Sequence, residues 1–346
     1  MTTAINTIVA GSRFGQFYAK GIAEDPHFNL LGILGQGSAR SAALAKQLNT
    51  RCFNHLKEIP ANTQLACIAI GGAARGKTGP AIAKALMDKQ IDILIEHPLL
   101  PQELNELLSY ANSLGRRCIV NSFYSSLPAV EQFINSAQKL HRKSPIRLIE
   151  VTCNIQLSYA ILDILAIILQ ATAPTAFQIT TERLEAIKEV QLNLAETAIS
   201  LTIINELAAN DDGAMTMLQR IHIIHQEGTL TLTSPHGPIL WEPIVNAPKT
   251  NNQGLFDIFD QPTKSLPHVA YYHNQAIDWS TIYQQLWPSY AVKAAQQLMA
   301  GKPIVANQQR TIDVCAIWQE LTQALSFPVA PKQQVRPALL ESILEN

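Results

Sequence analysis

The sequence has little charge and no excess of either sign. Asp, Glu, Lys and Arg make up 15% of the 346 residues, and the formal net charge at pH 7 is −1. Proteins that bind nucleic acid usually present a strongly basic face, so this composition argues against nucleic acid as a partner. The 47% of hydrophobic residues allow large cores, and the length suits two domains.

Long apolar runs are missing as well. The most apolar stretch, residues 157–169, is shorter than a membrane-spanning helix and contains Asp163. The N-terminus lacks the basic flank and apolar core of a signal peptide. We therefore expect a cytoplasmic protein with no membrane partner.

Cysteines are few and scattered, and none forms a C-x-x-C pair. No cluster of His, Cys and Asp has the spacing of metal ligands, so we predict no metal site. Single cysteines in a reducing cytoplasm are expected to be buried free thiols rather than disulfides. The five cysteines are Cys52, Cys67, Cys118, Cys153 and Cys315.

An apolar run near the start of the chain ends in a glycine-containing turn. Gly11 and Gly15 flank Ser12, Arg13 and Phe14, and a predicted helix follows at once. Strand, tight turn and helix form the usual site for a dinucleotide pyrophosphate, which faces backbone N–H groups and the positive helix end. In a G-x-G-x-x-G register only Gly15 fits, so this turn by itself is equally compatible with an ordinary strand–helix turn.

Strands and helices alternate from Thr7 to about Tyr124. Continuous apolar strands, such as residues 66–70 and 91–95, are separated by amphipathic helices. This pattern predicts an α/β domain over residues 1–124, with a parallel sheet covered by helices on both faces. Ligands of such sheets bind beyond the carboxyl ends of the strands, so the residues just after each strand are the informative ones.

The end of the second predicted strand, residues 30–34, is not followed by the acidic residue typical of NAD sites. N–H and hydroxyl donors with a guanidinium group suit a 2′-phosphate, which a carboxylate would repel. We therefore predict NADPH rather than NADH, although Ser38 could be a plain helix cap and Arg40 a solvated surface residue. The predicted contacts here are Gly35, Gly37, Ser38, Arg40 and Ser41.

The predicted cofactor site also includes residues of the first turn and residues after the other three strands. Those of the first turn are Gly11, Ser12, Arg13, Phe14 and Gly15. Gly72 and Thr78 belong to a glycine-rich loop after residues 66–70, beside the expected nicotinamide ribose. Glu96 and His97 end the strand over residues 91–95, and Asn121 ends the next. We predict that all of these residues contact the cofactor.

The second part of the chain, residues 125–346, has a different pattern. Several strands follow one another between residues 191 and 241, separated by hairpin signals such as Glu227-Gly228. Strands with helices on one face predict an α+β domain with an open antiparallel sheet. Because the open face must be covered, we expect a homodimer formed through it.

These features resemble the glucose–fructose oxidoreductase and inositol dehydrogenase superfamily, in which a Rossmann-type domain precedes an open-sheet α+β domain. In its sugar and polyol dehydrogenases one strand ends in Glu-Lys-Pro, and a helix carries Asp-x-x-x-His. This sequence has His97 in place of the lysine and keeps Asp163, but Ile167 stands where the histidine is expected. The proton acceptor for a sugar hydroxyl is therefore missing.

One branch of this superfamily matches better, the thiazolinyl imine reductases of siderophore assembly lines. Its members share five short strings with this chain, in the same order. They are Gly-x-x-Phe-Gly at Gly11–Gly15, Leu-x-Gly-Ser-x-Arg-Ser, approximated at Leu34–Ser41, Glu-His-Pro-Leu at Glu96–Leu99, Asn-x-Phe-Tyr at Asn121–Tyr124, and the His-Gly-Pro turn at Ser234–Trp241.

The resemblance implies an NADPH-dependent enzyme that reduces the C=N bond of a thiazoline ring to a thiazolidine. The implied substrate is a thioester on a carrier protein of a nonribosomal peptide synthetase, as in yersiniabactin and pyochelin assembly. Two alternatives stay open: a sugar or polyol dehydrogenase of the parent superfamily, and a sensor that binds NADPH without catalysis.

Imine reduction needs a proton for the ring nitrogen, and a positioned acid speeds such a step by about 10²–10⁴-fold. His97 and Tyr124 are the candidate catalytic residues, because both follow neighbouring strands. The alternatives are a structural His97 bound to the nicotinamide ribose and a Tyr124 that only lines the pocket. Asp163 is assigned to the substrate pocket, where it orients one of these groups or caps a buried polar network.

Overall fold

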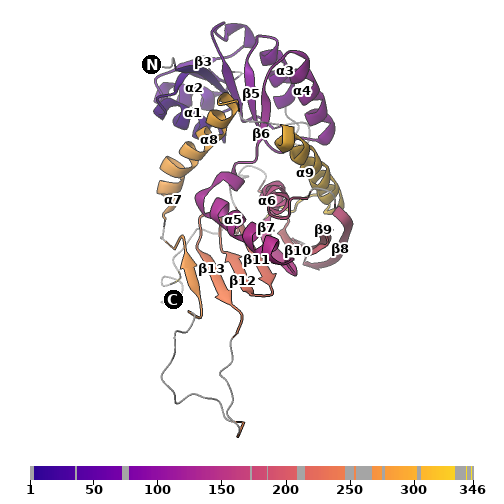
Figure 1. The fold of residues 1–346 in the computed structure, drawn as a ribbon. Coiled ribbons are helices and arrows are strands. Elements are labelled where there is room, and N and C mark those ends of the chain that lie inside the picture. The colour runs from indigo at the N-terminus through magenta and orange to yellow at the C-terminus, as the bar shows by residue number, and fades with distance from the viewer. Residues whose placement is uncertain are drawn as a thin grey trace.

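A computed structural model describes residues 4–35, 37–71, 78–171, 174–184, 186–208, 215–245, 253–254, 267–274, 277–301, 305–331, 340 and 344. Residues 174–184 and 305–307 are described by their backbone alone. Two sheets dominate the molecule, one above the other in Figure 1.

The first sheet has six strands in the order β3-β2-β1-β4-β5-β6, and every pair in it is parallel. The order reverses between β1 and β4, and sheets of this kind bind their ligands at the carboxyl ends of the two strands beside such a reversal. The predicted α/β domain is confirmed. Its strands are β1 (Ile5–Ala10), β2 (Phe28–Leu34), β3 (Arg51–Phe53), β4 (Leu65–Ile68), β5 (Asp92–Glu96) and β6 (Cys118–Asn121).

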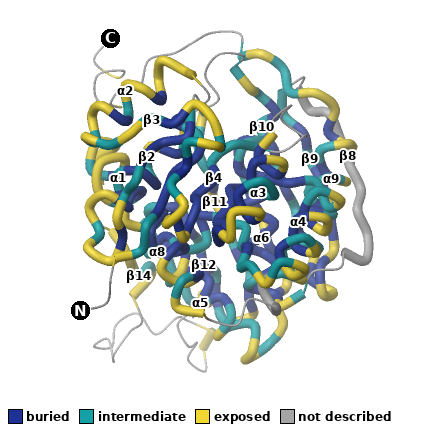
Figure 2. Tube along the Cα trace, turned by 90° about the horizontal axis from the view of Figure 1, so that it is seen from above, coloured by how far each residue is buried: buried dark blue, intermediate teal, exposed yellow. Residues whose placement is uncertain are grey.

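Helices cover both faces of this sheet (Figure 1). Because the sheet is covered from both sides, its central strands are mainly apolar without alternation, and all five residues of β5 are buried, including Asp92 and Glu96 at its ends. Figure 2 shows this buried interior inside a shell of exposed helical residues. The helices are α1 (Gly15–Glu24), α2 (Ala39–Gln47), α3 (Gly79–Met87) and α4 (Pro101–Ser113), with a 3₁₀ turn at Leu56–Glu58.

The second sheet has eight strands in the order β14-β13-β12-β11-β7-β10-β9-β8. All its pairs are antiparallel except β7 with β10, so the predicted antiparallel sheet is confirmed with one parallel pair. The strands are β7 (Leu148–Asn154), β8 (Pro174–Leu184), β9 (Ile187–Leu194), β10 (Thr197–Ile204), β11 (Gln219–His225), β12 (Gly228–Leu232), β13 (Ile239–Pro243) and β14 (Ala270–Tyr272).

Helices α5 (Pro128–Lys143) and α6 (Ser158–Leu169) lie across one face of the second sheet (Figure 1). Alternate residues of β7, β10 and β11 point into this layer and are buried, whereas their neighbours are half-buried or exposed. Short 3₁₀ turns precede both helices, at Tyr124–Ser126 and Ile155–Leu157.

The C-terminal helices return to the first half of the chain. Helix α7 (Trp279–Thr281) continues through a π-helical turn, Ile282–Leu286, into α8 (Trp287–Met299), which packs on α1. Helix α9 (Val305–Ala324) packs between α4 and α6. The predicted domain boundary at residues 124 and 125 stays a prediction, and these contacts join the two halves.

Among the residues that the structure describes, no helix has both the length and the apolar character needed to cross a bilayer.

Gly21 allows α1 and α8 to approach closely. A Cβ atom at this position would lie 2.2 Å from the carbonyl oxygen of Pro288 and 2.5 Å from Cγ2 of Val292. Since the carbonyl belongs to a helix backbone, it cannot move aside as a flexible side chain would.

We predict that Gly21→Ala destabilises the protein by about 1–3 kcal/mol, because overpacking forces the two helices apart. Without this contact, alanine in a helix would stabilise by about 0.4–1 kcal/mol. The free energy of unfolding in denaturant measures the difference, with the exposed Asn112→Ala in α4 as the control. A more stable Gly21→Ala variant would contradict the close packing.

Candidate active site

The turn after β1 packs closely against the neighbouring strand ends. Gly11 has φ +95°, and a Cβ atom there would lie 2.7 Å from the carbonyl oxygen of Ala69. A Cβ at Gly15, the first residue of α1, would lie 3.3 Å from Cγ1 of Val9. Among the described residues, the N–H groups of Phe14 and Gly15 have no backbone acceptor. These free donors at a helix N-terminus fit a pyrophosphate.

The structure brings four of the predicted cofactor residues into one cluster between this turn and α2. The Oγ of Ser12 accepts hydrogen bonds from Nε of Arg40 at 3.2 Å and from the hydroxyl of Ser41 at 2.9 Å. Ser38 caps α2, since its Oγ accepts from the N–H of Ser41 at 3.2 Å and donates to its hydroxyl at 2.7 Å. Three hydroxyl groups thus form a chain from the cap of α2 to Ser12, which also accepts from the guanidinium.

Gly35 and Gly37 shape the same turn. A Cβ atom at Gly35 would lie 2.1 Å from Cβ of Ser41, so only glycine fits beneath the cap of α2. Gly37 has φ +82°, and its N–H donates to the side chain of Asn54 at 3.1 Å. Of the other predicted cofactor residues, Thr78 is exposed just before α3, and Gly72 lies outside the described residues.

Phe14 points into an aromatic cluster rather than toward solvent. Its ring packs edge-on against Phe123 at 5.1 Å and lies 5.9 Å from Trp287 of α8. Arg13, which precedes it, is exposed. The cluster thus fixes the turn from below, and the predicted cofactor contacts of Arg13 and Phe14 stay predictions.

A buried hydrogen-bond network joins the ends of β5 and β6. The side-chain amide of Asn121 donates to the hydroxyl of Tyr18 at 2.6 Å, and this hydroxyl donates to the carboxylate of Glu96. The backbone carbonyl of Asn121 accepts a hydrogen bond from Nδ1 of His97 at 2.9 Å. Nδ1 also lies 3.4 Å from the Glu96 carboxylate. The side chains of Glu96 and Asn121 are therefore engaged within the protein.

His97 is held on a second side by a ring contact. Its imidazole stacks on the buried ring of Tyr159 in α6, with centroids 4.6 Å apart and planes at 22°. Because Nδ1 donates to a carbonyl, the neutral ring keeps its proton on Nδ1, and Nε2 is the nitrogen left for proton transfer. The predicted candidate is thus rigidly placed.

Tyr124 follows a strained turn. Phe123 has φ 56° and ψ −62°, and the N–H of Tyr124 donates to the carbonyl of Ser122 at 2.6 Å, which together define the rare form of γ-turn. The N–H of Phe123 donates to the side chain of Asn121 at 3.0 Å. Strain of this kind concentrates at functional sites, where the surrounding structure holds it in place.

The phenol of Tyr124 stays protonated over a wide pH range. Burial raises its pKa, and the nearby charge of Glu96 and the Tyr283 hydroxyl add to the rise. Its hydroxyl has no hydrogen-bond partner in the described part of the chain. A neutral phenol with an unused donor at the end of β6 is suited to give a proton to a ligand.

Each carboxylate oxygen of Asp163 already has a protein partner. One carboxylate oxygen accepts from the hydroxyl of Ser122 at 2.5 Å, and the other pairs with Nε of Arg310 at 3.1 Å. Its side chain is 4% exposed. Asp163 therefore ties α6 to α9 and to the residue before the strained turn, and its place in the substrate pocket stays a prediction.

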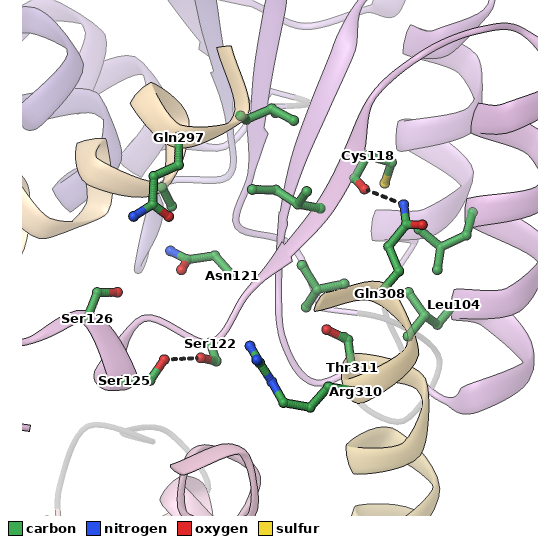
Figure 3. A pocket seen from close by; sticks show the side chains of 15 residues that line it. Leu104, Cys118, Asn121, Ser122, Ser125, Ser126, Gln297, Gln308, Arg310 and Thr311 are labelled. Carbon is green, nitrogen blue, oxygen red and sulfur yellow. Dashed lines mark hydrogen bonds between the residues drawn. The ribbon is translucent and has the colours of Figure 1, made fainter. Parts of the chain in front are cut away.

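A cavity of about 430 Å³ opens beside β6, between α4, α8 and α9. Figure 3 shows the guanidinium of Arg310 pointing toward Ser122 at one end of it, with Asn121 and Gln297 nearby. None of the described residues that line it belongs to the turns after β1 and β2. The cavity thus lies along the edge strand rather than on the predicted cofactor path.

Sequence reasoning missed an aromatic stripe that reaches this edge from the C-terminal part of the chain. Trp279, Tyr283 and Trp287 recur at intervals of four residues, a spacing that would have marked one face of a helix. Trp279 stacks on Tyr283 at 5.4 Å, and Trp287 packs against Tyr124 at 6.2 Å. Tyr283 lies in the π-helical turn, a rare conformation that often marks functional sites.

Within the described ranges, no group of three or more His, Cys, Asp and Glu side chains is arranged to hold a metal ion.

Two family models match the chain. Residues 5–122 match the model described as an oxidoreductase family with an NAD-binding Rossmann fold. The chain is thus an oxidoreductase of the glucose–fructose oxidoreductase and inositol dehydrogenase family. Residues 143–242 match the model described as thiazolinyl imine reductase Irp3-like, C-terminal. The chain therefore carries the C-terminal domain of the thiazolinyl imine reductases, and the resemblance seen in the sequence is confirmed.

Solved structures share the fold at low sequence identity. GenD2 from gentamicin A biosynthesis, in complex with NAD, is 14% identical over 92% of this chain and 93% of that chain, with a TM-score of 0.67. UDP-N-acetylglucosamine 3-dehydrogenase from Acidithiobacillus ferrooxidans is 15% identical over 93% and 98%, with a TM-score of 0.67. The 3-ketoreductase KijD10 from Actinomadura kijaniata, with TDP-benzene and NADP, is 12% identical over 95% and 99%, with a TM-score of 0.68. No curated protein sequence matches the chain.

His236 connects the aromatic stripe to the second sheet, and its half-buried ring is kept neutral. Its Nε2 accepts a hydrogen bond from Nε1 of Trp287 at 3.4 Å, and burial lowers its pKa to about 4. The unfolded chain takes up this proton near pH 6.5, so between pH 6.5 and 4 the unfolded state binds more protons than the folded one.

We predict that the stability contributed by His236 is present above about pH 6.5 and is lost as the pH falls toward 4. Denaturant unfolding of the wild type and of His236→Gln at several pH values measures this contribution as their difference. The advantage of the wild type should shrink across this window. A difference that stays constant with pH would show that the imidazole is not held neutral.

Proposed function

We propose that this protein reduces the C=N bond of a thiazoline ring to a thiazolidine with NADPH, on a siderophore intermediate carried by a nonribosomal peptide synthetase. The observation that carries the proposal is the match of residues 143–242 to the thiazolinyl imine reductases. This region forms most of the second sheet together with α6, which lies between the two sheets in Figure 1.

The residues at the strand ends support imine reduction over alcohol oxidation. Ile167 on α6 has no group that could accept a proton from a sugar hydroxyl, and Asp163 is occupied by Ser122 and Arg310. The position after Glu96 is a histidine whose Nε2 is left for proton transfer. A reducible C=N bond requires a donor of protons instead, and both His97 and Tyr124 can serve as one.

A reduced nicotinamide bound across the turns after β1 and β4 would supply the hydride for the ring carbon. Negative charge then develops on the ring nitrogen, which needs a proton at the same time. Tyr124 offers a neutral phenol held by the strained turn, and protonated His97 offers the N–H of Nε2. We assign Tyr124 as the donor, because its hydroxyl has no partner among the described residues.

Preference for NADPH is supported by the cluster around Arg40. Its Nε is used by Ser12, whereas the two terminal nitrogens of the guanidinium make no hydrogen bond to the rest of the described chain. This open fork lies beside the cap of α2, as bidentate recognition of a 2′-phosphate requires. No acidic side chain takes part in the cluster to repel the phosphate.

The aromatic stripe supports a substrate with an aryl group. Trp279 and Tyr283 are 51% and 42% exposed although they are large rings. Tyr283 lies close enough to Tyr124 to influence the pKa of its phenol. A hydroxyphenyl-thiazoline is flat and apolar on both faces, so stacking on these exposed rings would place it beside the proposed proton donor.

Two protein partners belong to this proposal. The carrier protein would present its thioester from the open side of the aromatic stripe. A second copy of the chain would cover the outer face of the second sheet, where Thr152, Ser200 and Thr231 are half-buried. We retain both partners as proposals.

The proposed reaction is tested with a synthetic thioester of a hydroxyphenyl-thiazoline carboxylate. Loss of NADPH absorbance should accompany a product with two additional hydrogens, detected by mass spectrometry. The same preparation is offered NADP⁺ with a panel of sugars and polyols. Turnover of a sugar without turnover of the thiazoline would replace the proposal by a sugar dehydrogenase. NADPH binding with neither reaction would favour a sensor.

Tyr124→Phe should lower kcat about a hundredfold with little change in KM, because it removes only the proton donor. Tyr290→Phe, which loses a phenol on α8 beside Lys293, is the matched control and should keep wild-type kinetics. An unchanged kcat in Tyr124→Phe would transfer the proton-donating role to His97 or to water.

Arg40→Ala should raise KM for NADPH about tenfold or more and leave KM for NADH nearly unchanged, because a charge-assisted hydrogen bond to the 2′-phosphate is lost. Arg51→Ala removes a surface arginine that covers the ring of Phe53 and controls for lost positive charge. Equal effects of Arg40→Ala on the two cofactors would contradict the assignment of the 2′-phosphate site.

A further inference from the structure

A buried tyrosine that the proposed reaction does not use lies at the centre of the site. Tyr18 is on α1, the helix that begins at the turn after β1, and it is 1% exposed. Its hydroxyl donates to the carboxylate of Glu96 and accepts from Nδ2 of Asn121 at 2.6 Å. A single phenol thus links α1 to the ends of both β5 and β6.

These contacts leave one orientation for the amide of Asn121. Nδ2 faces the Tyr18 oxygen and lies 3.5 Å from the Glu96 carboxylate, and both of these atoms need a donor. Oδ1 consequently faces the N–H of Phe123, which donates to it at 3.0 Å. The strained turn at Phe123 is therefore held by an amide whose direction depends on the tyrosine.

Both candidate proton donors depend on the same asparagine. Tyr124 directly follows the turn that the Asn121 side chain holds, and Nδ1 of His97 donates to the Asn121 backbone carbonyl. A change in the amide would release the N–H of Phe123, and the turn could then relax toward a less strained conformation. The phenol of Tyr124 would move with it.

We propose that Tyr18 is a positioning residue that acts through Asn121 on the placement of Tyr124 and His97. Tyr18 has no contact with solvent, so it touches neither cofactor nor substrate. Its effect on turnover rests on the proposed function of Tyr124 and His97 as proton donors. Its effect on the position of Tyr124 does not, and the two effects can be measured separately.

The first measurement is independent of catalysis. The protein is labelled with 3-fluorotyrosine, and the fluorine resonance of Tyr124 is assigned from its absence in Tyr124→Phe. Tyr18→Phe should shift or broaden this resonance, because the turn before Tyr124 relaxes. Tyr110→Phe is the matched control, since its phenol also donates to a carboxylate, that of Asp88, but does so on α4 away from the turn.

A second variant reaches the same turn without altering Tyr18. Asn121→Ser removes the amide that holds the N–H of Phe123, so it should produce a similar change in the Tyr124 resonance. This variant keeps the test decisive if Tyr18→Phe folds poorly. An unchanged Tyr124 resonance in Tyr18→Phe would overturn the proposal. If Tyr18→Phe does not fold, an unchanged resonance in Asn121→Ser would overturn it instead.

The second measurement is turnover of the thiazoline thioester. Tyr18→Phe should lower kcat about tenfold while the Kd for NADPH stays within twofold, as expected for the loss of one buried hydrogen bond that acts on geometry. The double variant with Asn121→Ser should be no slower than Asn121→Ser alone, because both changes act through one contact.

Kinetic effects that multiply in the double variant would show that Tyr18 acts independently of Asn121 and would overturn the proposal. If the wild type does not reduce the thiazoline, the proposed function fails, and the fluorine measurement alone decides whether Tyr18 positions Tyr124. Failure of the two ideas is therefore distinguishable.

Discussion

Burial of the Glu96 carboxylate is the constraint on which the rest of the site depends. A charged group that leaves water is strongly destabilising unless hydrogen-bond donors surround it. Here Tyr18 on α1 and Asn121 at the end of β6 donate hydrogen bonds to it, and Nδ1 of His97, on the loop after β5, lies 3.4 Å from it. The need to satisfy one carboxylate thus brings α1 and the ends of β5 and β6 into a single arrangement.

The packing of α8 on α1 is the second interaction that holds these strand ends in place. Close packing of α8 on α1 is possible only because Gly21 has no side chain. Trp287 then reaches Phe14, Phe17, Phe123 and Tyr124, so one indole contacts the turns after β1 and β6 together. The aromatic cluster spans residues more than 270 positions apart in a chain of 346, and this explains why no local pattern could foretell it.

Polar groups at the strand ends divide into those already satisfied and those still open. The side chains of Glu96, Asn121 and Asp163 have protein partners. The terminal nitrogens of Arg40 and the hydroxyl of Tyr124 have no hydrogen-bond partner among the described residues. The N–H groups of Phe14 and Gly15 have no backbone acceptor there either. Open donors, and not merely polar residues, mark the places where a dinucleotide and a basic ring nitrogen could bind.

The alternation of apolar strands and helices predicted the parallel sheet, because strands buried on both faces must be apolar throughout and their connections must cross the sheet. The positions of Gly11, Gly15 and Ser38 were predictable for a similar reason, since tight turns and helix caps are local structures. The sequence could also place His97 and Tyr124 just after neighbouring strands. It could not tell which side chains are engaged, because Tyr18, the partner of Asn121, and Arg310, the partner of Asp163, come from distant segments. Only the tertiary structure decided that Tyr18 and Trp287 belong to the site and that Arg40 contacts Ser12. Hydrogen bonds and ring contacts between distant segments depend on how the chain folds in space, and sequence spacing does not encode them.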